Sequence, residues 1–349
     1  MDIIHSTVRK RKSYQVEVKY SILWECALGI AAITNEPLHE TLERPISYWD
    51  RVKSELPASL LRELEYVQKH NTWKGLLQLL HELNEPTLDE FINFIKTRSS
   101  FELKYHCLPF VGEEFQEFRE RAAKGDDQAL DELKKIAADN PFFPAYMAFI
   151  VHTDVKELTN HLVEVMSQWY EHVVLADTKE TEAILQTDYE AKIKMQNQLG
   201  VEAFVQWATG GISYQPEPHV YSVLLIPQIC YRPWSIEADI EGKKVFYYPV
   251  SNASLRPGDL YASPDFLVQK YKALGDDVRL KVVKMLSEGD RSLQEITEQL
   301  ALGKSTVHHH LKLLRSAKLV EVKEQKYSLK REALQLMNKE LEEYVERQH

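Results

Sequence analysis

The stretch Lys304-Ser305-Thr306-Val307-His308-His309-His310-Leu311-Lys312-Leu313-Leu314-Arg315-Ser316 decides the fold of the C-terminal part of this chain. Val307, Leu311 and Leu314 recur at helical spacing, so they share one face that must be buried. The pattern predicts an amphipathic helix with the layout of a recognition helix. Its opposite face is polar and basic, with Ser305, Thr306, His308, His309, Lys312 and Arg315.

A second, shorter helix is expected directly before this one. Ser292 and Glu295 have the spacing of a capping box, in which each side chain accepts from the other's backbone N–H. The box introduces an amphipathic segment over 293–300. Residues 301–303 then leave room for only a tight turn, in which we expect Gly303 to adopt the positive φ. Two short helices joined in this way have helix-turn-helix spacing.

The residues that follow predict a small β-hairpin and a final helix. Segments 319–323 and 326–329 read as strands joined around Glu324 and Gln325, which is the position of a wing. Helices are expected at the two ends of the module, over 266–272 and 333–345. The last helix has an apolar stripe that we expect to pack against a partner subunit, with docking on the N-terminal body as the alternative. The stripe consists of Leu334, Met337, Leu341 and Tyr344.

Residues 272–283, Met285-Leu286 and 305–315 together resemble the ArsR/SmtB family of bacterial winged-helix regulators. The resemblance covers the last quarter of the chain. It implies a homodimer that docks two recognition helices in successive major grooves of double-stranded DNA, usually as a repressor. It also implies base contacts from Ser305, Thr306, His308 and His309 and phosphate contacts from Lys312 and Arg315, to which we add the wing residues Lys323 and Lys326.

The chain departs from the metal-sensing members that it resembles. The helix over 293–300 contains no Cys, and residues 334–346 contain no His. The consecutive histidines at 308–310 point in different directions from a helix, so they do not converge on one ion. We therefore expect no metal site and no cofactor. His308 also stands where the family often has a small Ser, so the family's base preference does not carry over.

Charge is distributed unevenly along the chain. The 349 residues include 43 Lys and Arg against 53 Asp and Glu, a formal net charge of −10. Residues 266–331 carry 14 basic and 8 acidic side chains, whereas residues 1–264 carry 27 and 39. A basic module attached to an acidic body is the pattern expected when one module alone meets DNA phosphates.

The N-terminal body is predicted to be α+β, mostly helical and closed by a small antiparallel sheet. Amphipathic helices are expected from residue 22 to residue 208, and strands over 219–226, 234–240 and 243–249, to which a strand at 14–18 is a candidate addition. We predict a regulatory or oligomerisation domain over 1–250, a linker over 251–264 and the winged helix-turn-helix over 265–349. Around 226–234 and 247–250 the body resembles the uncharacterised N-terminal domain of long ArsR-type regulators.

Candidate catalytic or ligand residues in this body have simpler structural interpretations. His161, Glu164, Gln168 and His172 could hold a metal or share a proton, but they also read as the solvated face of a helix. Arg232 could clamp an anion beside Trp234, whereas the neighbouring aromatic residues could equally fill the core of the sheet. No nucleophile, metal cluster or nucleotide loop stands out. We therefore expect no enzyme, and we keep an enzyme or a protein-interaction scaffold as alternatives.

Cysteine content and hydropathy indicate the compartment. Cys26, Cys107 and Cys230 are widely spaced and odd in number, which fits a reducing cytoplasm better than a disulfide framework. No apolar run has the length of a membrane span. The sequence thus predicts a cytoplasmic, dimeric regulator of transcription that binds an inverted-repeat operator, with the 1–250 body modulating the dimer geometry or binding a small-molecule effector.

Overall fold

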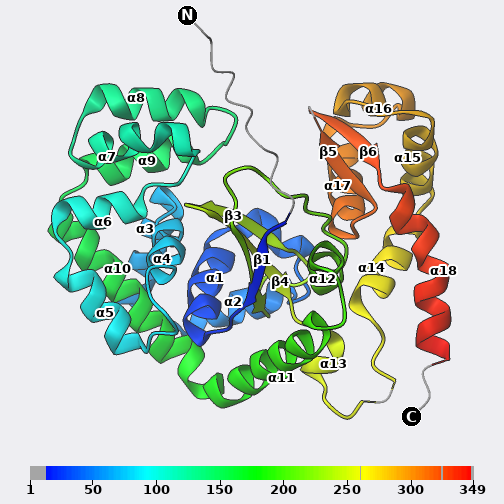
Figure 1. Ribbon diagram of the computed structural model, residues 1–349, viewed down its shortest axis with the longest axis horizontal. Coiled ribbons are helices and arrows are strands. Elements are labelled where there is room, and N and C mark those ends of the chain that lie inside the picture. The colour runs from blue at the N-terminus through cyan, green and yellow to red at the C-terminus, as the bar shows by residue number, and fades with distance from the viewer. Residues whose placement is uncertain (1–12, 260, 324, 347–349) are drawn as a thin grey trace, which may run out of the picture. The chain divides into compact units, whose positions relative to one another are not determined.

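Two separate hydrophobic cores divide the chain, and each belongs to one of two units (Figure 1). The computed structural model describes residues 13–259, 261–323 and 325–346. The N-terminal unit contains the residues up to Val201 together with Gln215–Pro249, and the C-terminal unit contains Glu202–Tyr214 and the residues from Val250 onward. Segments 202–214 and 251–264, placed from sequence in the N-terminal domain and in a linker, are thus both part of the C-terminal unit.

The N-terminal unit is mostly helical, as predicted, with a small sheet. Its buried centre is α1, Ile22–Thr34, whose residues from Leu23 to Ile33 are all buried. A helix that is apolar on every side must be surrounded, and α1 is packed by α3, α4, α10 and α11. The other elements are η1 Glu36–Thr41, α2 Ile46–Glu55, α3 Ala58–His70, α4 Trp73–Leu80, α5 Leu88–Thr97, α6 Ser100–Cys107, η2 Glu113–Phe115, α7 Gln116–Ala123, α8 Asp127–Ile136, α9 Phe143–His152, α10 Val155–Trp169, η3 Tyr170–Val174, η4 Leu175–Asp177 and α11 Thr178–Gln196.

The sheet of this unit has four strands in the order β1-β2-β4-β3. They are β1 Gln15–Val18, β2 Ser222–Gln228, β3 Ile236–Ile240 and β4 Lys243–Pro249. The expected hairpin between β3 and β4 is present, with Gly242 at a φ of 71° in its turn. The expectation of an antiparallel sheet is wrong for the other pairs, because β2 runs parallel to both β1 and β4.

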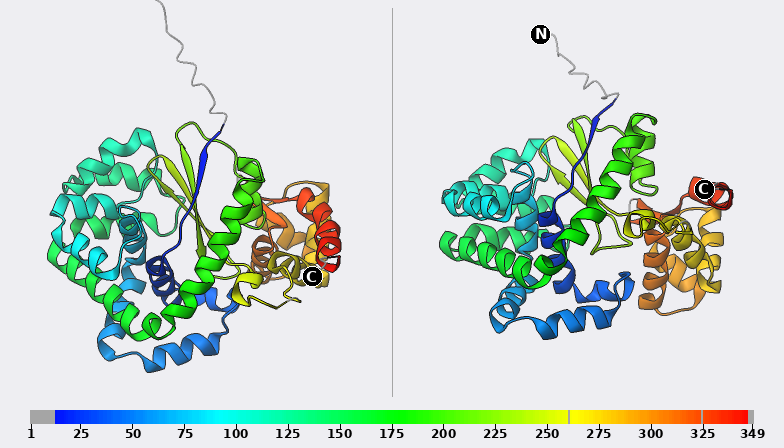
Figure 2. Two further views of the ribbon diagram at one scale, coloured as in Figure 1. Left: turned by 60° about the horizontal axis from the view of Figure 1, so that its bottom comes forward. Right: turned by 90° about the horizontal axis from the view of Figure 1, so that it is seen from below.

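Burial on both faces explains the parallel pairing. Every residue of β2 is buried, and parallel strands occur where helices cover both sides of a sheet. One face joins the main core through Leu224 and Ile226. On the other face, the hydroxyl of Tyr248 donates to Asp188 of α11, which crosses that side of the sheet in Figure 2. The uninterrupted apolar run in β2 was the sequence signal for this arrangement.

The C-terminal unit has the predicted winged-helix order around its own core. The core is formed by α15, α16, α17 and the wing, with Val282, Ile296, Leu311 and Leu319 among its fully buried residues. Its elements are α12 Val201–Ala208 from Glu202 onward, α13 Asn252–Leu255, α14 Asp265–Leu274, α15 Asp277–Glu288, α16 Leu293–Leu300, α17 Lys304–Ser316, β5 Val320–Lys323, β6 Lys326–Leu329 and α18 Arg331–Val345.

Candidate nucleic-acid interface

The turn between α16 and α17 is made by residues whose backbone conformations differ from the prediction. The capping box at the start of α16 is present, with Ser292 and Glu295 each accepting from the other's backbone N–H. The left-handed residue is Ala301, with a φ of 52°, and not Gly303. Gly303 is extended and forms the N-cap of α17. The positive φ falls at the residue that ends α16, because that is where the chain must reverse to release the helix.

Helix α17 has one buried and one exposed face, as the periodicity predicts. Val307, Leu311 and Leu314 are completely buried in the C-terminal core. On the other side Lys312 is half-buried, and the remaining polar residues expected to contact DNA are exposed. These exposed residues are Ser305, Thr306, His308, His309 and Arg315.

His310 belongs to the inner side of α17. Its ring is half-buried, and its Nδ1 lies 3.6 Å from Oδ1 of Asp276, the N-cap residue of α15. Burial lowers the pKa of His310, and the nearby Asp276 carboxylate opposes this shift. The three consecutive histidines therefore divide into two exposed rings and one that packs against the domain.

The wing is a two-stranded hairpin anchored to the helices. Val320 pairs with Leu329 at its base, and Lys323 pairs with Lys326 at its tip. Tyr327 is buried, and its backbone exchanges hydrogen bonds with Arg291, which precedes α16. Both wing lysines are exposed. Of the two residues expected at the connection, Gln325 has a φ of 61° and Glu324 lies outside the described residues.

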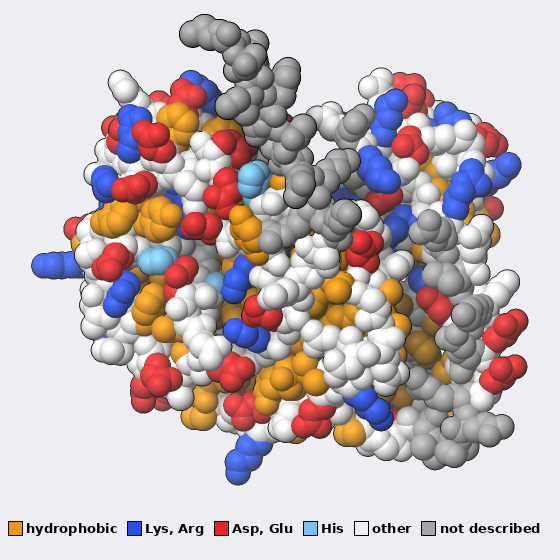
Figure 3. All heavy atoms as spheres, viewed as in Figure 1, with side chains coloured by type: hydrophobic (Ala, Val, Ile, Leu, Met, Phe, Trp, Pro, Cys, Tyr) orange, Lys and Arg blue, Asp and Glu red, His pale blue; other side chains and the backbone are white. Residues whose placement is uncertain are grey.

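Acidic residues are interspersed with the basic ones around the wing. Lys323 Nζ lies 2.6 Å from Oε1 of Glu321, and this hydrogen bond raises the pKa of Lys323. Figure 3 shows the same mixture of Lys, Arg, Asp and Glu side chains over the end of the unit that carries α15, α16 and the wing. The basic side chains at this end alternate with carboxylates, so Lys323 carries its charge beside a negative neighbour.

The terminal helices α14 and α18 contact each other through an ion pair. Both carboxylate oxygens of Glu340 lie 2.7 Å from Nζ of Lys270, a residue that is only 4% exposed. Along the predicted stripe of α18, Met337 is buried, whereas Leu341 is 38% exposed and Val345 beyond it is 72% exposed. Met337 of the stripe thus packs in the domain, whereas Leu341 and the neighbouring Val345 leave apolar side chains in solvent.

The candidate residues of the N-terminal unit occupy structural positions. His161 is buried, which corrects its assignment to a solvated helix face, while Glu164 and His172 are exposed. His161 Nδ1 contacts Glu63, and its Nε2 lies 2.7 Å from the hydroxyl of Thr72. Thr72 is completely buried and His161 nearly so, whereas the Glu63 side chain is partly exposed, so the His161 ring is held inside the unit between two partners.

Arg232 and the aromatic residues beside it are also committed to internal contacts. Arg232 is buried and donates from Nε to Glu43 at 2.9 Å, so an anion would have to displace that carboxylate. Tyr247 and Tyr248 are completely buried, and Trp234 donates to the hydroxyl of Thr41. In this structure these aromatic residues pack in and around the sheet.

The described residues form neither a metal-binding cluster nor a membrane-spanning helix. Among the described residues, no three His, Cys, Asp or Glu side chains come together in a way that could hold a metal ion. Within the same ranges, no helix combines the length and apolar character that a bilayer crossing requires. The three cysteines are buried as free thiols.

Comparison with known proteins finds similarity over the helix-turn-helix and the start of the wing. Residues 276–322 match the model of the bacterial regulatory proteins of the arsR family. A 50-residue stretch is 32% identical to the transcriptional repressor SdpR of Bacillus subtilis (strain 168). That match covers 14% of this chain, and the chain spans 56% of the relative's length. No solved structure matches the chain.

Proposed function

Because the C-terminal unit contains an ArsR-family winged helix, we propose that this protein is a sequence-specific, DNA-binding regulator of transcription. The observation that carries the proposal is that α17 has one buried face and one exposed face. Its apolar face is completely buried in the domain core, while its polar face remains open along nearly the whole helix. A helix held firmly by one face and exposed on the other suits insertion in the major groove of DNA.

The roles of the side chains follow from their positions on α17 and the wing. Ser305, Thr306, His308 and His309 lie in the first half of the helix, where a recognition helix meets base edges. Lys312 and Arg315 lie toward its other end and contact phosphates in this proposal. Lys323 and Lys326 contact phosphates from the wing, and Glu321 reduces the contribution of Lys323.

We further propose that two copies bind an inverted-repeat operator and act as a repressor. The end of α18 exposes Leu341 and Val345, and α14 exposes Tyr271, so apolar surface at the terminal helices is available for a second copy. A closed two-fold pair would set two α17 helices about one DNA turn apart, at about 34 Å. Repression is the activity named for SdpR, and it extends to this chain only as part of the proposal.

In this proposal the protein acts in the cytoplasm. Its N-terminal unit has a modulatory role. It contributes most of the acidic residues of the chain, which favours an orientation away from DNA. No contact described for it favours catalysis, since His161 and Arg232 are buried and each is paired with a carboxylate of its own unit. A scaffold function would predict no salt-dependent binding to duplex DNA.

The test is selection of bound duplexes from a random pool by the full-length protein. We expect a palindromic consensus whose two halves lie about 10 base pairs apart. His309→Ala should relax the choice of base at one position in each half-site, whereas Lys312→Ala should weaken binding to all sequences similarly. A pool without enrichment would exclude sequence-specific regulation and return weight to the enzyme and scaffold alternatives.

A further inference from the structure

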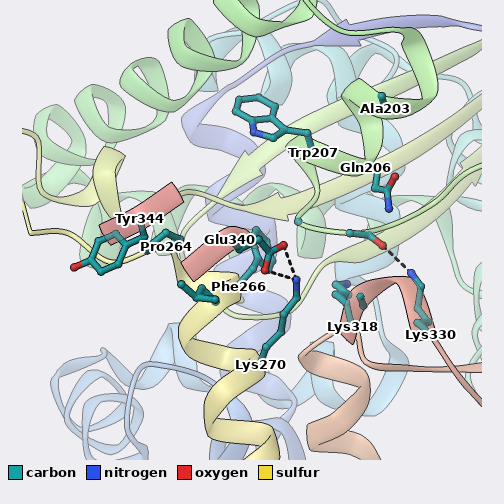
Figure 4. Close-up of a pocket in the computed structure, with 14 residues that line it drawn as sticks. Ala203, Gln206, Trp207, Pro264, Phe266, Lys270, Lys318, Lys330, Glu340 and Tyr344 are labelled. Carbon is teal, nitrogen blue, oxygen red and sulfur yellow. Dashed lines mark hydrogen bonds and ion pairs between the residues drawn. The ribbon is translucent and has the colours of Figure 1, made fainter. Parts of the chain in front are cut away.

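The C-terminal unit contains a cavity of about 580 Å³ that lies apart from the exposed face of α17. It is bounded by α12 and the residues after it, by α14, by α18, and by Lys318 and Lys330 (Figure 4). This volume is within the range of sites that hold small organic molecules. Segment 202–214, which forms one wall, is separated by 35 residues in sequence from the rest of the unit.

Specific contacts hold this wall in place. Gly210 has a φ of 68°, and a Cβ at this position would lie 1.9 Å from the ring of Phe266 in α14. Only glycine therefore allows the backbone to approach that ring so closely. On the other side, Lys330 donates from Nζ to the carbonyl of Gly211 at 2.7 Å. The cavity is thus built by the fold of the unit and does not result from a loosely placed helix.

The lining combines aromatic walls with ammonium groups. Trp207, Phe266 and Tyr344 supply rings, and Trp207 is 41% exposed although it is large and apolar. Figure 4 shows Lys318 and Lys330 together on one side of the cavity and Tyr344 on the opposite side. The hydroxyl of Tyr344 donates to the carbonyl of Tyr261, which orients its ring. A planar ligand could stack on such rings while its polar end points toward the lysines.

Charge decides which ligand fits. The described lining contains three Lys side chains and one carboxylate, that of Glu340. Both oxygens of Glu340 already accept from Lys270, so the negative charge of this carboxylate is balanced by that ammonium group. Lys318 and Lys330 add two positive charges at the same cavity. A cation would meet repulsion from these groups, whereas an anion would be attracted by them.

We propose that this cavity is a binding site for a small aromatic carboxylate. The ring of the ligand lies among Trp207, Phe266 and Tyr344, and its carboxylate faces Lys318 and Lys330. The Lys270–Glu340 pair forms a closed, neutral part of the wall.

The position of the site gives it a regulatory consequence. Lys318 comes two residues after the end of α17, and Lys330 lies between the wing and α18. Backbone hydrogen bonds connect Lys318 to Arg315 and Lys330 to Leu319. A ligand that bridges these residues to α12 would favour one placement of α17 relative to α14 and α18. This consequence rests on the proposed function, whereas binding of the carboxylate does not.

Binding is tested by calorimetric titration of the full-length protein with indole-3-acetate. Indole-3-acetamide and tryptamine serve as neutral and cationic probes of the same ring. We expect indole-3-acetate to bind at least about ten-fold more tightly than either of them, since each would lose the attraction of the ammonium groups. Benzoate, salicylate and 1-naphthoate extend the aromatic carboxylate class. Absence of binding by all four carboxylates, or tighter binding of tryptamine, would overturn the proposal.

Two variants locate the site and one serves as a control. Lys330→Gln keeps a donor for Gly211 but removes the charge, and it should weaken the binding of indole-3-acetate by about ten-fold. Ala203→Trp fills the cavity from an exposed position, where the larger side chain is tolerated by folding, and it should abolish binding. Lys156→Gln, an exposed change in the N-terminal unit, should leave binding unchanged. Unchanged affinity in the Ala203→Trp variant would place the ligand elsewhere.

The regulatory consequence is measured separately, as operator affinity with and without saturating indole-3-acetate. We expect a change of about ten-fold or more in the wild type and no change in Ala203→Trp. Binding of the carboxylate without any change in operator affinity would refute the coupling and leave the site intact. Failure of the ligand-free protein to bind DNA would refute the proposed function instead.

Discussion

Arg315→Ala tests whether α17 is the DNA-contacting helix through the salt dependence of binding. Arg315 is exposed near the end of α17 and makes no ion pair with the described residues. Loss of its guanidinium should therefore remove a phosphate contact without disturbing the domain. Each neutralised phosphate contributes about −0.9 to the slope of log binding constant against log salt concentration.

The magnitude follows from the proposed contacts. Lys312, Arg315, Lys323 and Lys326 from each subunit of a dimer give about eight phosphate contacts, and hence a slope of about −7. Between about 50 and about 200 mM salt, affinity should fall about twenty-thousand-fold. Arg315→Ala removes two contacts per dimer, so the slope should become about −5 and the loss about two-thousand-fold.

The assay is fluorescence anisotropy of a labelled operator over a salt series, with Lys156→Ala as the control. Lys156 is exposed and basic, but it lies in the N-terminal unit, so its replacement should leave the slope unchanged. A slope in Arg315→Ala equal to that of the wild type would refute the placement of α17 against the phosphate backbone. An equal change in Lys156→Ala would show that overall charge, and not the interface, sets the slope.

Three predictions concern stability and are checked by denaturant unfolding. Leu311→Ala should destabilise the C-terminal unit by about 2–5 kcal/mol, because Leu311 is completely buried in its core, and a smaller loss would contradict that packing. Ala301→Gly should stabilise the same unit by about 1 kcal/mol, because glycine adopts the left-handed conformation of Ala301 without strain; destabilisation would argue against that conformation. His81 accepts or donates a hydrogen bond with the hydroxyl of Tyr247, and burial lowers its pKa to about 4. As the pH falls, His81 is protonated in the unfolded chain before it is protonated in the folded protein. The free energy of unfolding should therefore be highest above about pH 6.5 and should fall by about 3 kcal/mol as the pH approaches 4. His81→Gln should flatten this part of the pH profile, and an unchanged profile would exclude His81 as its origin.

Local sequence signals were sufficient for the helix-turn-helix but not for its turn. The capping box at Ser292 and the buried triplet on α17 both follow from spacing alone, and the structure confirms both. The left-handed residue did not follow, because glycine is merely the residue that most easily adopts positive φ. Where the chain reverses depends on where α16 ends, so Ala301 adopts that conformation although Gly303 is nearby.

The strand directions and the burial of His161 could not be predicted from local sequence patterns. The β3–β4 hairpin could be predicted from Glu241 and Gly242, since a tight turn joins antiparallel neighbours. The pairing of β1 with β2 joins residues about 200 positions apart, and a pattern of period two does not distinguish the two strand directions. His161 was likewise ambiguous, because its burial depends on Glu63 and Thr72 from other helices.

The sequence by itself determined the winged-helix module, its exposed recognition face and the basic character of residues 266–331. These features depend on periodicity, capping and local charge, which act between residues close together in the chain. Only the tertiary structure decided that segment 202–214 belongs to the C-terminal unit and encloses a cavity there. That decision depends on the contact of Gly210 with Phe266 and on the hydrogen bond from Lys330 to the carbonyl of Gly211. Their partners are distant in sequence, and packing and charge pairing act between whichever side chains the fold brings into contact.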